Sequence, residues 1–249
     1  MTGWVAIIGI GPGDEALWTS QVRDILNEAT DVVGYIPYVN RISDRAGLMK
    51  HASDNRVEID RSRHALEMAA TGRKVVVVSS GDPGVFAMAS AVFEAVDDGP
   101  EEWRALDIRV CPGITAMLAA SASAGAVLGH DFAAINLSDN LKPWEMIERR
   151  LRLVVEGDFA AAFYNPRSKT RPEGFEKFLH VLSEVCEPER ILIFARNVSL
   201  PDETLRVVQL KDATPDMADM RTVVLLGSSR TKVIDRDGAP WVYTPRFAE

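Results

Sequence analysis

The sequence predicts an α/β protein with two domains, the first built on a mostly parallel sheet and the second on a mixed sheet. Four consecutive valines at 75–78 indicate a strand buried on both faces, which is typical of the middle of a parallel sheet. Strand-like apolar runs alternate with helical patterns through the first half of the chain, as in βαβ units. The runs at 204–210 and 222–227 lie so close in sequence that part of the second sheet is expected to be antiparallel.

The first domain is expected to span 1–127, with its elements in an order that places helices on both faces of the sheet. Its predicted strands are 4–10, 31–35, 74–78 and 107–111. Its predicted helices are 15–29, 58–70, 85–93 and a small-residue helix that follows the turn at 112–116 and ends at 126. The polar segment 40–55 is expected to hold a further short helix.

The second domain is expected to span 128–249, with a hinge at 128–132. Its predicted strands are 133–137, 159–164, 190–195, 204–210 and 222–227. Its predicted helices are 143–155, which begins with a proline suited to a first helical turn, and 173–186. The tail after Ser228 has no clear pattern.

Composition excludes several classes of protein. The chain has 249 residues and a formal net charge of −8, which argues against a nucleic-acid binder with a general basic surface. Its two cysteines, Cys111 and Cys186, form neither a disulfide framework nor a metal motif. No basic leader and no membrane-spanning apolar run are recognisable, so a cytoplasmic protein without membrane contact is expected.

A glycine-rich turn, Gly9-Ile-Gly-Pro-Gly-Asp14, follows the first predicted strand. It departs from the dinucleotide fingerprint, because Asp14 stands where that motif requires glycine and Pro12 lacks an amide donor. Without a Gly-Lys-Ser/Thr sequence it is not a P-loop either. A turn that shapes another kind of cleft is favoured over a phosphate site, and Asp14 fits a helix cap.

The turn Ser79-Ser-Gly-Asp-Pro-Gly84 follows the valine strand, at the edge where open α/β sheets bind ligands. It contains no lysine and one acid, so it offers mainly backbone groups. These suit a small zwitterionic or hydroxylated ligand better than a polyphosphate. The alternative is an ordinary strand-to-helix turn.

A basic loop follows the predicted strand 159–164. Arg167, Lys169 and Arg171 are three cations within five positions of an otherwise acidic protein, and they are candidates to pair with carboxylates or phosphates. A solvated basic loop is the alternative. Further cations near predicted strand ends could add to a polyanion site: Arg41, Arg45, Lys142 and Arg196.

The sequence contains no recognisable catalytic constellation. The four histidines are scattered, and no metalloprotease motif, nucleophile elbow or Cys-x-x-Cys is present. His130 beside Asp131 is either a base or, more simply, a structural residue at the hinge. The absence of an evident acid, base or metal favours chemistry in which a cofactor carries the difficult step.

Three motifs together resemble the tetrapyrrole methylase family, the class III S-adenosylmethionine-dependent methyltransferases. They are the turns 9–14 and 79–84 with the following Val85-Phe-Ala87, and the turn Pro112-Gly-Ile-Thr-Ala116, in the family's order and spacing over nearly the whole chain. Segments 34–39, 136–144 and 164–171 are most similar to the members that act on precorrin-3B in cobalamin biosynthesis.

The resemblance implies two α/β domains with S-adenosylmethionine in the cleft between them, in a homodimer without a metal. The implied reaction is methyl transfer to C17 of precorrin-3B, with ring contraction to precorrin-4. Alternatives are another precorrin or cobalt-precorrin methyltransferase, a member acting on diphthamide or ribosomal RNA, or a non-catalytic S-adenosylmethionine-binding protein.

The resemblance also implies roles for individual residues. The implied cofactor contacts are Pro12, Gly81, Asp82, Val85, Thr115, Ala116, Tyr164, Asn165 and Asn197. Substrate candidates are the aromatic residues Tyr35, Tyr38 and Trp144 for the macrocycle, and the cations Arg167, Lys169 and Arg171 for its acetates and propionates. Asp14 and Asp139 are candidates to move protons during ring contraction.

Overall fold

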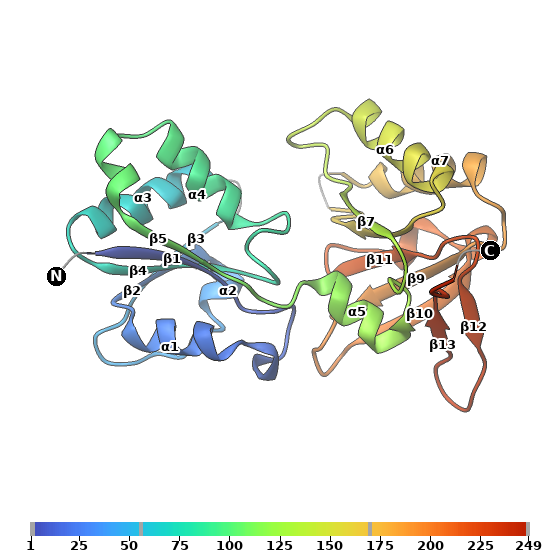
Figure 1. Cartoon of the computed structure of the whole chain (residues 1–249), viewed down its shortest axis with the longest axis horizontal. Coiled ribbons are helices and arrows are strands. Elements are labelled where there is room, and N and C mark those ends of the chain that lie inside the picture. Colours follow the sequence, from blue (N-terminus) through green and yellow to red (C-terminus); the bar gives the residue numbers. More distant parts are fainter. Residues whose placement is uncertain (1–2, 55–56, 169–170, 248–249) are drawn as a thin grey trace. The chain divides into compact units, whose positions relative to one another are not determined.

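The computed structural model describes residues 3–54, 57–168 and 171–247, which form two compact α/β units, 1–115 and 116–249. The predicted fold class is confirmed: the first unit contains a five-stranded parallel sheet and the second a five-stranded mixed sheet (Figure 1).

The strands of the first sheet lie in the order β3-β2-β4-β1-β5, and every pairing is parallel. Their bounds are β1 (Trp4–Gly9), β2 (Asp31–Tyr35), β3 (Met49–Ser53), β4 (Lys74–Ser79) and β5 (Asp107–Cys111). The central position of β4 beside β1 explains the valine run, since both faces of the strand are covered.

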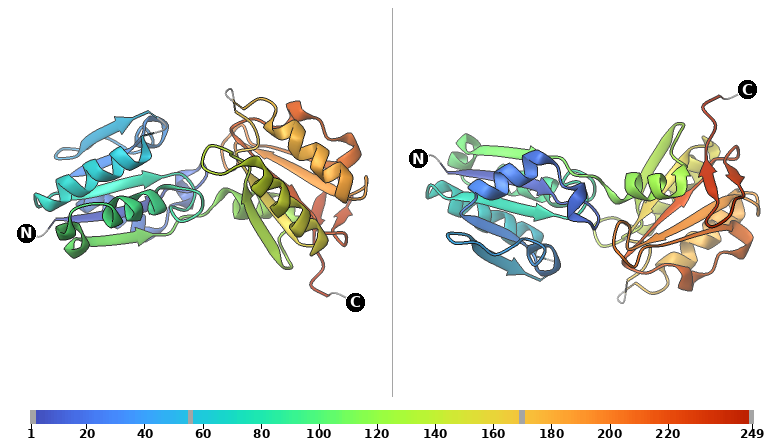
Figure 2. Two further views of the ribbon diagram at one scale, coloured as in Figure 1. Left: turned by 90° about the horizontal axis from the view of Figure 1, so that it is seen from above. Right: turned by 90° about the horizontal axis from the view of Figure 1, so that it is seen from below.

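Helices cover both faces of this sheet, as the two views of Figure 2 make clear. The helical elements of the unit are η1 (Glu15–Leu17), α1 (Ser20–Glu28), α2 (Ile36–Val39), α3 (Glu58–Ala70), α4 (Met88–Asp97) and η2 (Glu101–Ala105). Alternate β1 residues serve the two faces: Ile8 packs with α1, while Ile7 packs with α3 and α4.

Three predicted elements of the first unit differ from the observed ones. The helix expected over 15–29 is divided, because Thr19 is extended and caps α1 by accepting from the Val22 amide. The segment 40–55 contains the edge strand β3 rather than a helix. The helix expected over 85–93 begins later, at Met88, because Phe86 has a left-handed backbone, with φ 54°.

The second sheet has the order β10-β9-β11-β8-β7. Its strands are β7 (Phe132–Asn136), β8 (Ala160–Tyr164), β9 (Ile191–Arg196), β10 (Thr204–Gln209) and β11 (Thr222–Leu226). β7 pairs with β8 in parallel, while β11 is antiparallel to both β8 and β9 and β10 is antiparallel to β9. The predicted antiparallel portion is therefore confirmed.

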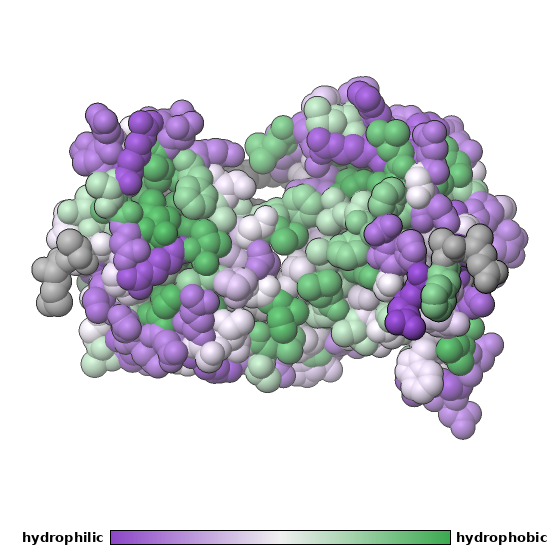
Figure 3. Space-filling view, in the orientation of Figure 1, coloured by the Kyte–Doolittle hydropathy of each residue, from purple (hydrophilic) through white to green (hydrophobic). Residues whose placement is uncertain are grey.

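The helical elements of the second unit are α5 (Ala116–Ala124), α6 (Trp144–Glu156), α7 (Gly174–Val185), η3 (Leu210–Asp212) and η4 (Pro215–Met217). α6 and α7 pack on one face around Phe163, Phe175 and Phe178, and α5 packs on the other. Apolar side chains also remain at the surface, including Leu141 and Trp241, and Figure 3 shows such residues interspersed with hydrophilic ones in both units.

The tail after Ser228, which shows no pattern in the sequence, forms part of a third sheet. β12 (Lys232–Ile234) is antiparallel to β13 (Trp241–Tyr243), which pairs in parallel with β6 (Gly125–Ala126). This pairing and the packing of α5 on β11 group residues 116–127 with the second unit. The division therefore falls earlier than the boundary expected at 127.

Within the described ranges, no helix combines the length and apolar character that crossing a membrane requires.

Candidate functional site

Three glycine-containing turns lie together at the carboxyl edge of the first sheet. They follow β1, β4 and β5, which are adjacent and parallel, so their carboxyl ends share one edge. The first two turns are joined by a pair of backbone hydrogen bonds: the Gly11 amide donates to the Gly81 carbonyl at 3.2 Å, and the Gly81 amide donates to the Gly11 carbonyl at 3.0 Å. This is the edge at which open α/β sheets bind ligands.

Glycine is required here because main chain packs directly against main chain. A Cβ at Gly113 would lie 2.3 Å from the Gly81 carbonyl oxygen, and one at Gly9 would lie 2.5 Å from the same atom. Gly11 and Gly81 also have left-handed φ angles of 64° and 63°. Gly9, Gly11, Gly81 and Gly113 thus form one surface of closely packed backbone, called the glycine floor below.

Asp82 joins the second turn to the third. One carboxylate oxygen accepts from the Gly84 amide at 2.8 Å, and the other accepts from the Gly113 amide at 3.0 Å. The Asp82 carboxylate thus holds the backbone of both turns in place, and both of its oxygens take part.

Phe86, the second residue after this turn, has a conformation that the sequence does not predict. Its backbone is left-handed and its side chain is 46% exposed. A left-handed bulky residue is uncommon and often marks a functional turn. A phenylalanine directly before a helix gives no sequence signal of this conformation.

Arg41 and Arg45, two of the cations that the sequence suggests for a polyanion site, bind backbone carbonyls in the structure. Arg41 donates to the carbonyls of the first glycine turn. Arg45 donates to the carbonyls at the C-terminal end of α1, Leu26 and Ala29. Arg196, a third candidate, is paired with Asp219 at 2.8 Å.

The aromatic candidates of the first unit lie at the end of β2 and in α2. Tyr35 and Tyr38 meet edge to face, with ring centroids 5.3 Å apart. Tyr38 hydrogen-bonds to Ser80, and burial raises the pKa of its phenol. Tyr38 therefore lies beside the second glycine turn, close to the predicted cofactor residues Gly81 and Asp82.

The other first-unit candidates are distributed around the same edge. Pro12 is half-buried in the first turn, Val85 is half-buried after the second, and Thr115 is buried after the third. Asp14 is exposed and caps η1, accepting from the Ala16 amide at 2.7 Å. Ala116 begins α5 in the second unit.

In the second unit, β7, β8 and β9 run in the same direction, so their carboxyl ends share an edge. Asn165 and Asn197 follow β8 and β9 with left-handed φ angles of 54° and 51°. Because β11 lies between those strands, the two asparagines are separated by about 10 Å.

The predicted cofactor residues at this edge have defined partners. Tyr164 accepts a hydrogen bond at its hydroxyl from the Met117 amide, which fixes the first turn of α5. The side-chain amide of Asn165 donates to the Asn136 side chain at 3.1 Å, and the side-chain amide of Asn197 donates to the Asp202 carboxylate at 2.6 Å.

The basic loop is anchored to the same unit. Arg167 donates to the Pro215 carbonyl, and Arg171 donates to the carbonyls of Leu137 and Asn165. Arg171 Nε is buried without a hydrogen-bond partner in the described part of the chain, and it lies 3.7 Å from an Asp139 oxygen. The structure therefore brings Arg171 and Asp139 together, whereas Lys169 lies outside the described residues.

Trp144, the third aromatic candidate, begins α6 and packs against the core of the second unit, with the Lys177 ammonium 6.0 Å from its ring centre. His130 Nδ1 lies 3.8 Å from Asp131, so the two neighbours do meet. Over the described residues, no group of three or more potential metal-binding side chains lies together.

A model of the family described as tetrapyrrole (corrin/porphyrin) methylases matches residues 5–214. A Sinorhizobium protein named precorrin-3B C(17)-methyltransferase is 49% identical over 248 residues, which cover 99% of this chain and 98% of that protein. A crystal structure of the methyltransferase CobJ, 63% identical, superposes with a TM-score of 0.93 over 98% of this chain and 100% of the other.

A more distant structure shares the fold. The uroporphyrin-III C-methyltransferase of Thermus thermophilus, solved with S-adenosylhomocysteine, is 22% identical. It superposes with a TM-score of 0.66 over 90% of this chain and 97% of that one.

Proposed function

The chain belongs to the tetrapyrrole methylase family, and we propose that it methylates C17 of precorrin-3B with S-adenosylmethionine and contracts the ring to give precorrin-4. It is a methyltransferase of cobalamin biosynthesis. The observation that carries the proposal is the identity of 49% with the Sinorhizobium enzyme over nearly the whole length of both chains.

The three glycine turns fit S-adenosylmethionine. They present main chain and two carboxylates, Asp14 and Asp82, and they contain no lysine or arginine. They therefore suit a positively charged sulfonium with an ammonium and hydroxyls better than a polyphosphate. We assign Pro12, Gly81, Asp82, Val85 and Thr115 to this cofactor. From the second unit, the family resemblance adds Ala116, Tyr164, Asn165 and Asn197.

When bound, S-adenosylmethionine supplies a methyl group made electrophilic by the positive sulfur. The protein then has three tasks: to hold the donor, to align the acceptor carbon and to exclude water, none of which needs a side-chain nucleophile. The rigid turns serve the first task, because an orientation fixed by backbone packing costs no reordering on binding.

The substrate is a macrocycle that bears carboxylates. Arginine has five N–H donors, and in the described part of the chain Arg167 and Arg171 use theirs on one and two carbonyls, respectively. We propose that their other donors, with Lys169, bind the acetates and propionates. Tyr35, Tyr38 and Trp144 are proposed contacts for the ring, and Asp14 and Asp139 are proposed proton carriers. We further propose a cytoplasmic homodimer.

Calorimetry followed by product analysis tests this function. The protein is expected to bind S-adenosylmethionine and S-adenosylhomocysteine, and then to add one methyl group to precorrin-3B, detected by mass spectrometry. Parallel incubations with the cobalt-bearing ring and with the preceding methylation intermediate test the substrate choice. Binding of the cofactor without methylation of precorrin-3B would disprove the substrate assignment. Failure to bind both S-adenosylmethionine and S-adenosylhomocysteine would disprove the proposed methyltransferase activity.

A further inference from the structure

Arg41 makes an unusual set of contacts beneath the first glycine turn. Its Nη2 donates to the carbonyls of Ile10 at 2.8 Å and Gly13 at 2.5 Å, and its Nη1 lies 3.3 Å from the Gly11 carbonyl. One guanidinium thus contacts carbonyls on both sides of Pro12, a proposed cofactor residue. One side chain thus helps to orient three peptide groups, alongside the hydrogen bonds that the Gly11 carbonyl accepts from Gly81 and Ser80.

The charge of Arg41 is balanced in an uncommon way. In the described part of the chain its guanidinium forms no ion pair with a carboxylate, although burial is sufficient to lower its pKa. Backbone oxygens carry partial negative charge, and here they are the hydrogen-bond partners of the half-buried cation, while the Glu15 carboxylate attracts it from beyond ion-pair distance. The turn and Arg41 therefore depend on each other.

The same turn is linked to its neighbour through side chains. The Ser80 hydroxyl donates to the Gly11 carbonyl at 3.4 Å, and Tyr38, one helical turn before Arg41, hydrogen-bonds to Ser80. Arg41, Ser80 and Tyr38 thus connect the first and second turns from the side of α2.

Arg45 provides an internal comparison, because it also contacts three carbonyls. Those belong to Leu26, Ala29 and Ala46, at the C-terminal end of α1 and beyond it. Both arginines donate hydrogen bonds to backbone carbonyls, but only Arg41 does so at the carboxyl edge of the sheet.

We propose that Arg41 is a positioning residue for the cofactor: it fixes the Gly11–Gly13 backbone in the orientation that binds S-adenosylmethionine. This inference rests on the proposed function. It assigns Arg41 no contact with the cofactor, so its loss acts through the shape of the turn.

The test compares Arg41→Met, Arg41→Lys and Arg45→Met with the wild-type protein. The measurements are the Kd for S-adenosylhomocysteine, KM for S-adenosylmethionine, kcat and the urea midpoint. Arg41→Met is expected to weaken S-adenosylhomocysteine binding by roughly tenfold to a hundredfold, by analogy with the loss of residues that orient metal ligands. Arg41→Lys, which keeps the charge but not the planar fork, is expected to weaken it by about threefold to tenfold.

Arg45→Met is expected to lower the urea midpoint while leaving Kd and KM unchanged, which separates positioning from general stability. If Arg41→Met does not fold, Arg41→Lys decides the question. Wild-type affinity in either folded Arg41 variant would overturn the inference. Failure of the wild-type protein to bind S-adenosylhomocysteine would instead overturn the proposed function.

Discussion

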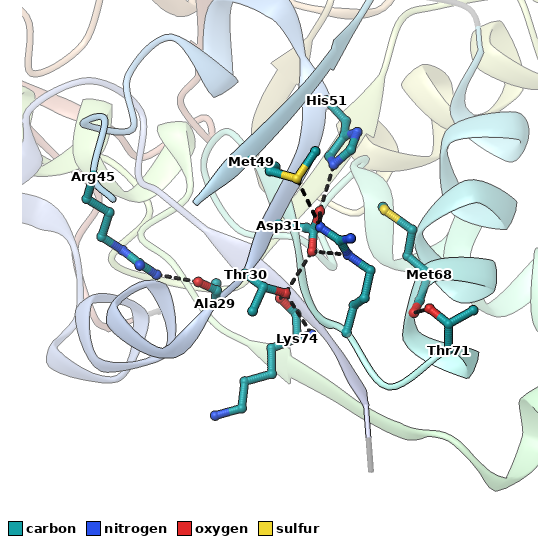
Figure 4. A network of polar contacts seen from close by, with 10 residues as sticks. Ala29, Thr30, Asp31, Arg45, Met49, His51, Met68, Thr71 and Lys74 are labelled. Atoms are coloured by element: carbon teal, nitrogen blue, oxygen red, sulfur yellow. Dashed lines mark hydrogen bonds and ion pairs between the residues drawn. The ribbon is translucent and has the colours of Figure 1, made fainter. Parts of the chain in front are cut away.

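The amino edge of the first sheet, where its parallel strands begin, and the carboxyl edge, where they end, are held together in different ways. At the amino edge, side chains bind one another: Asp31 accepts from Arg73 Nε at 2.6 Å, from Thr30 at 2.7 Å and from His51 at 2.7 Å (Figure 4). At the carboxyl edge, the backbones of Gly11 and Gly81 hydrogen-bond to each other, and the Gly113 backbone packs against those of Gly81 and Gly9. The charged side chains of the amino edge pair with one another, whereas the carboxyl edge presents backbone peptide groups. Mutations at the two edges should therefore separate stability from cofactor affinity.

The largest effect is expected from Gly113→Ala. Its new Cβ would meet the carbonyl oxygens of Gly81 and Gly9 at 2.3 and 2.6 Å, and neither is free to move away. We expect a loss of about 3 kcal/mol in the free energy of unfolding, together with loss of S-adenosylhomocysteine binding. Urea unfolding and calorimetry measure the two quantities.

Gly84→Ala is the matched control for this prediction. Its Cβ would meet only Asp82 Oδ1, at 3.2 Å, and Gly84 is exposed. The free energy of unfolding should change by less than about 1 kcal/mol. Equal losses in the two alanine variants would show that the glycine floor is not closely packed.

A smaller effect, confined to stability, is expected from Arg73→Met at the amino edge. Removing the double contact to the fully buried Asp31 carboxylate should cost about 2 kcal/mol at neutral pH. The Kd for S-adenosylhomocysteine should stay at the wild-type value. A tenfold change in Kd would mean that the two edges are coupled.

The same network predicts a pH dependence. Burial raises the pKa of Asp31, but hydrogen bonds from Arg73, Thr30 and His51 outweigh it and leave the pKa below its usual value. The stability from this group is therefore complete above the unfolded-state pKa of about 4 and is lost as the pH falls through the lower folded-state pKa. In urea unfolding, Asp31→Asn should reduce the fall in the free energy of unfolding between about pH 5 and pH 2. An unchanged fall would mean that other carboxylates cause the loss of stability in acid.

The smallest effect is expected from Tyr38→Phe, which keeps the ring and removes the hydrogen bond to Ser80. The cost should be about 1 kcal/mol or less. Because burial raises the pKa of Tyr38, ultraviolet titration of the wild-type protein should contain a tyrosine that ionises above the usual value of about 10, and the variant should lack it. An identical titration of both proteins would contradict this placement.

Much of the carboxyl edge was predictable from the sequence. Turns after Gly9, Ser79 and Cys111 follow strands that the apolar runs identify, and parallel pairing brings them together. The carbonyl contacts of two arginines were not predictable, because the type of a residue does not indicate that its partner is a backbone carbonyl. Arg41 and Arg45 look like any other cations near strand ends.

Two other features depended on tertiary context. β3, with the sequence Met-Lys-His-Ala-Ser, has no strand-like apolar run, and it forms through its register with β2 and the contact of His51 with Asp31. The left-handed turns at Asn165 and Asn197 serve positions where the first unit uses glycine. Asparagine tolerates the left-handed conformation, but its presence in a sequence does not predict that conformation.

The parallel pairing of β13 with β6 has a consequence for how the chain is made. The Thr244 amide donates to the Ala126 carbonyl, and the Thr244 hydroxyl donates to the Val127 carbonyl. The second unit therefore cannot complete these contacts until residue 244 has left the ribosome, whereas all the strands of the first sheet have been synthesised by residue 111. At ordinary rates of translation this difference is on the order of ten seconds. During that interval the newly made α5 lacks its β13 neighbour. A chaperone would therefore bind the second unit of the nascent chain rather than the first.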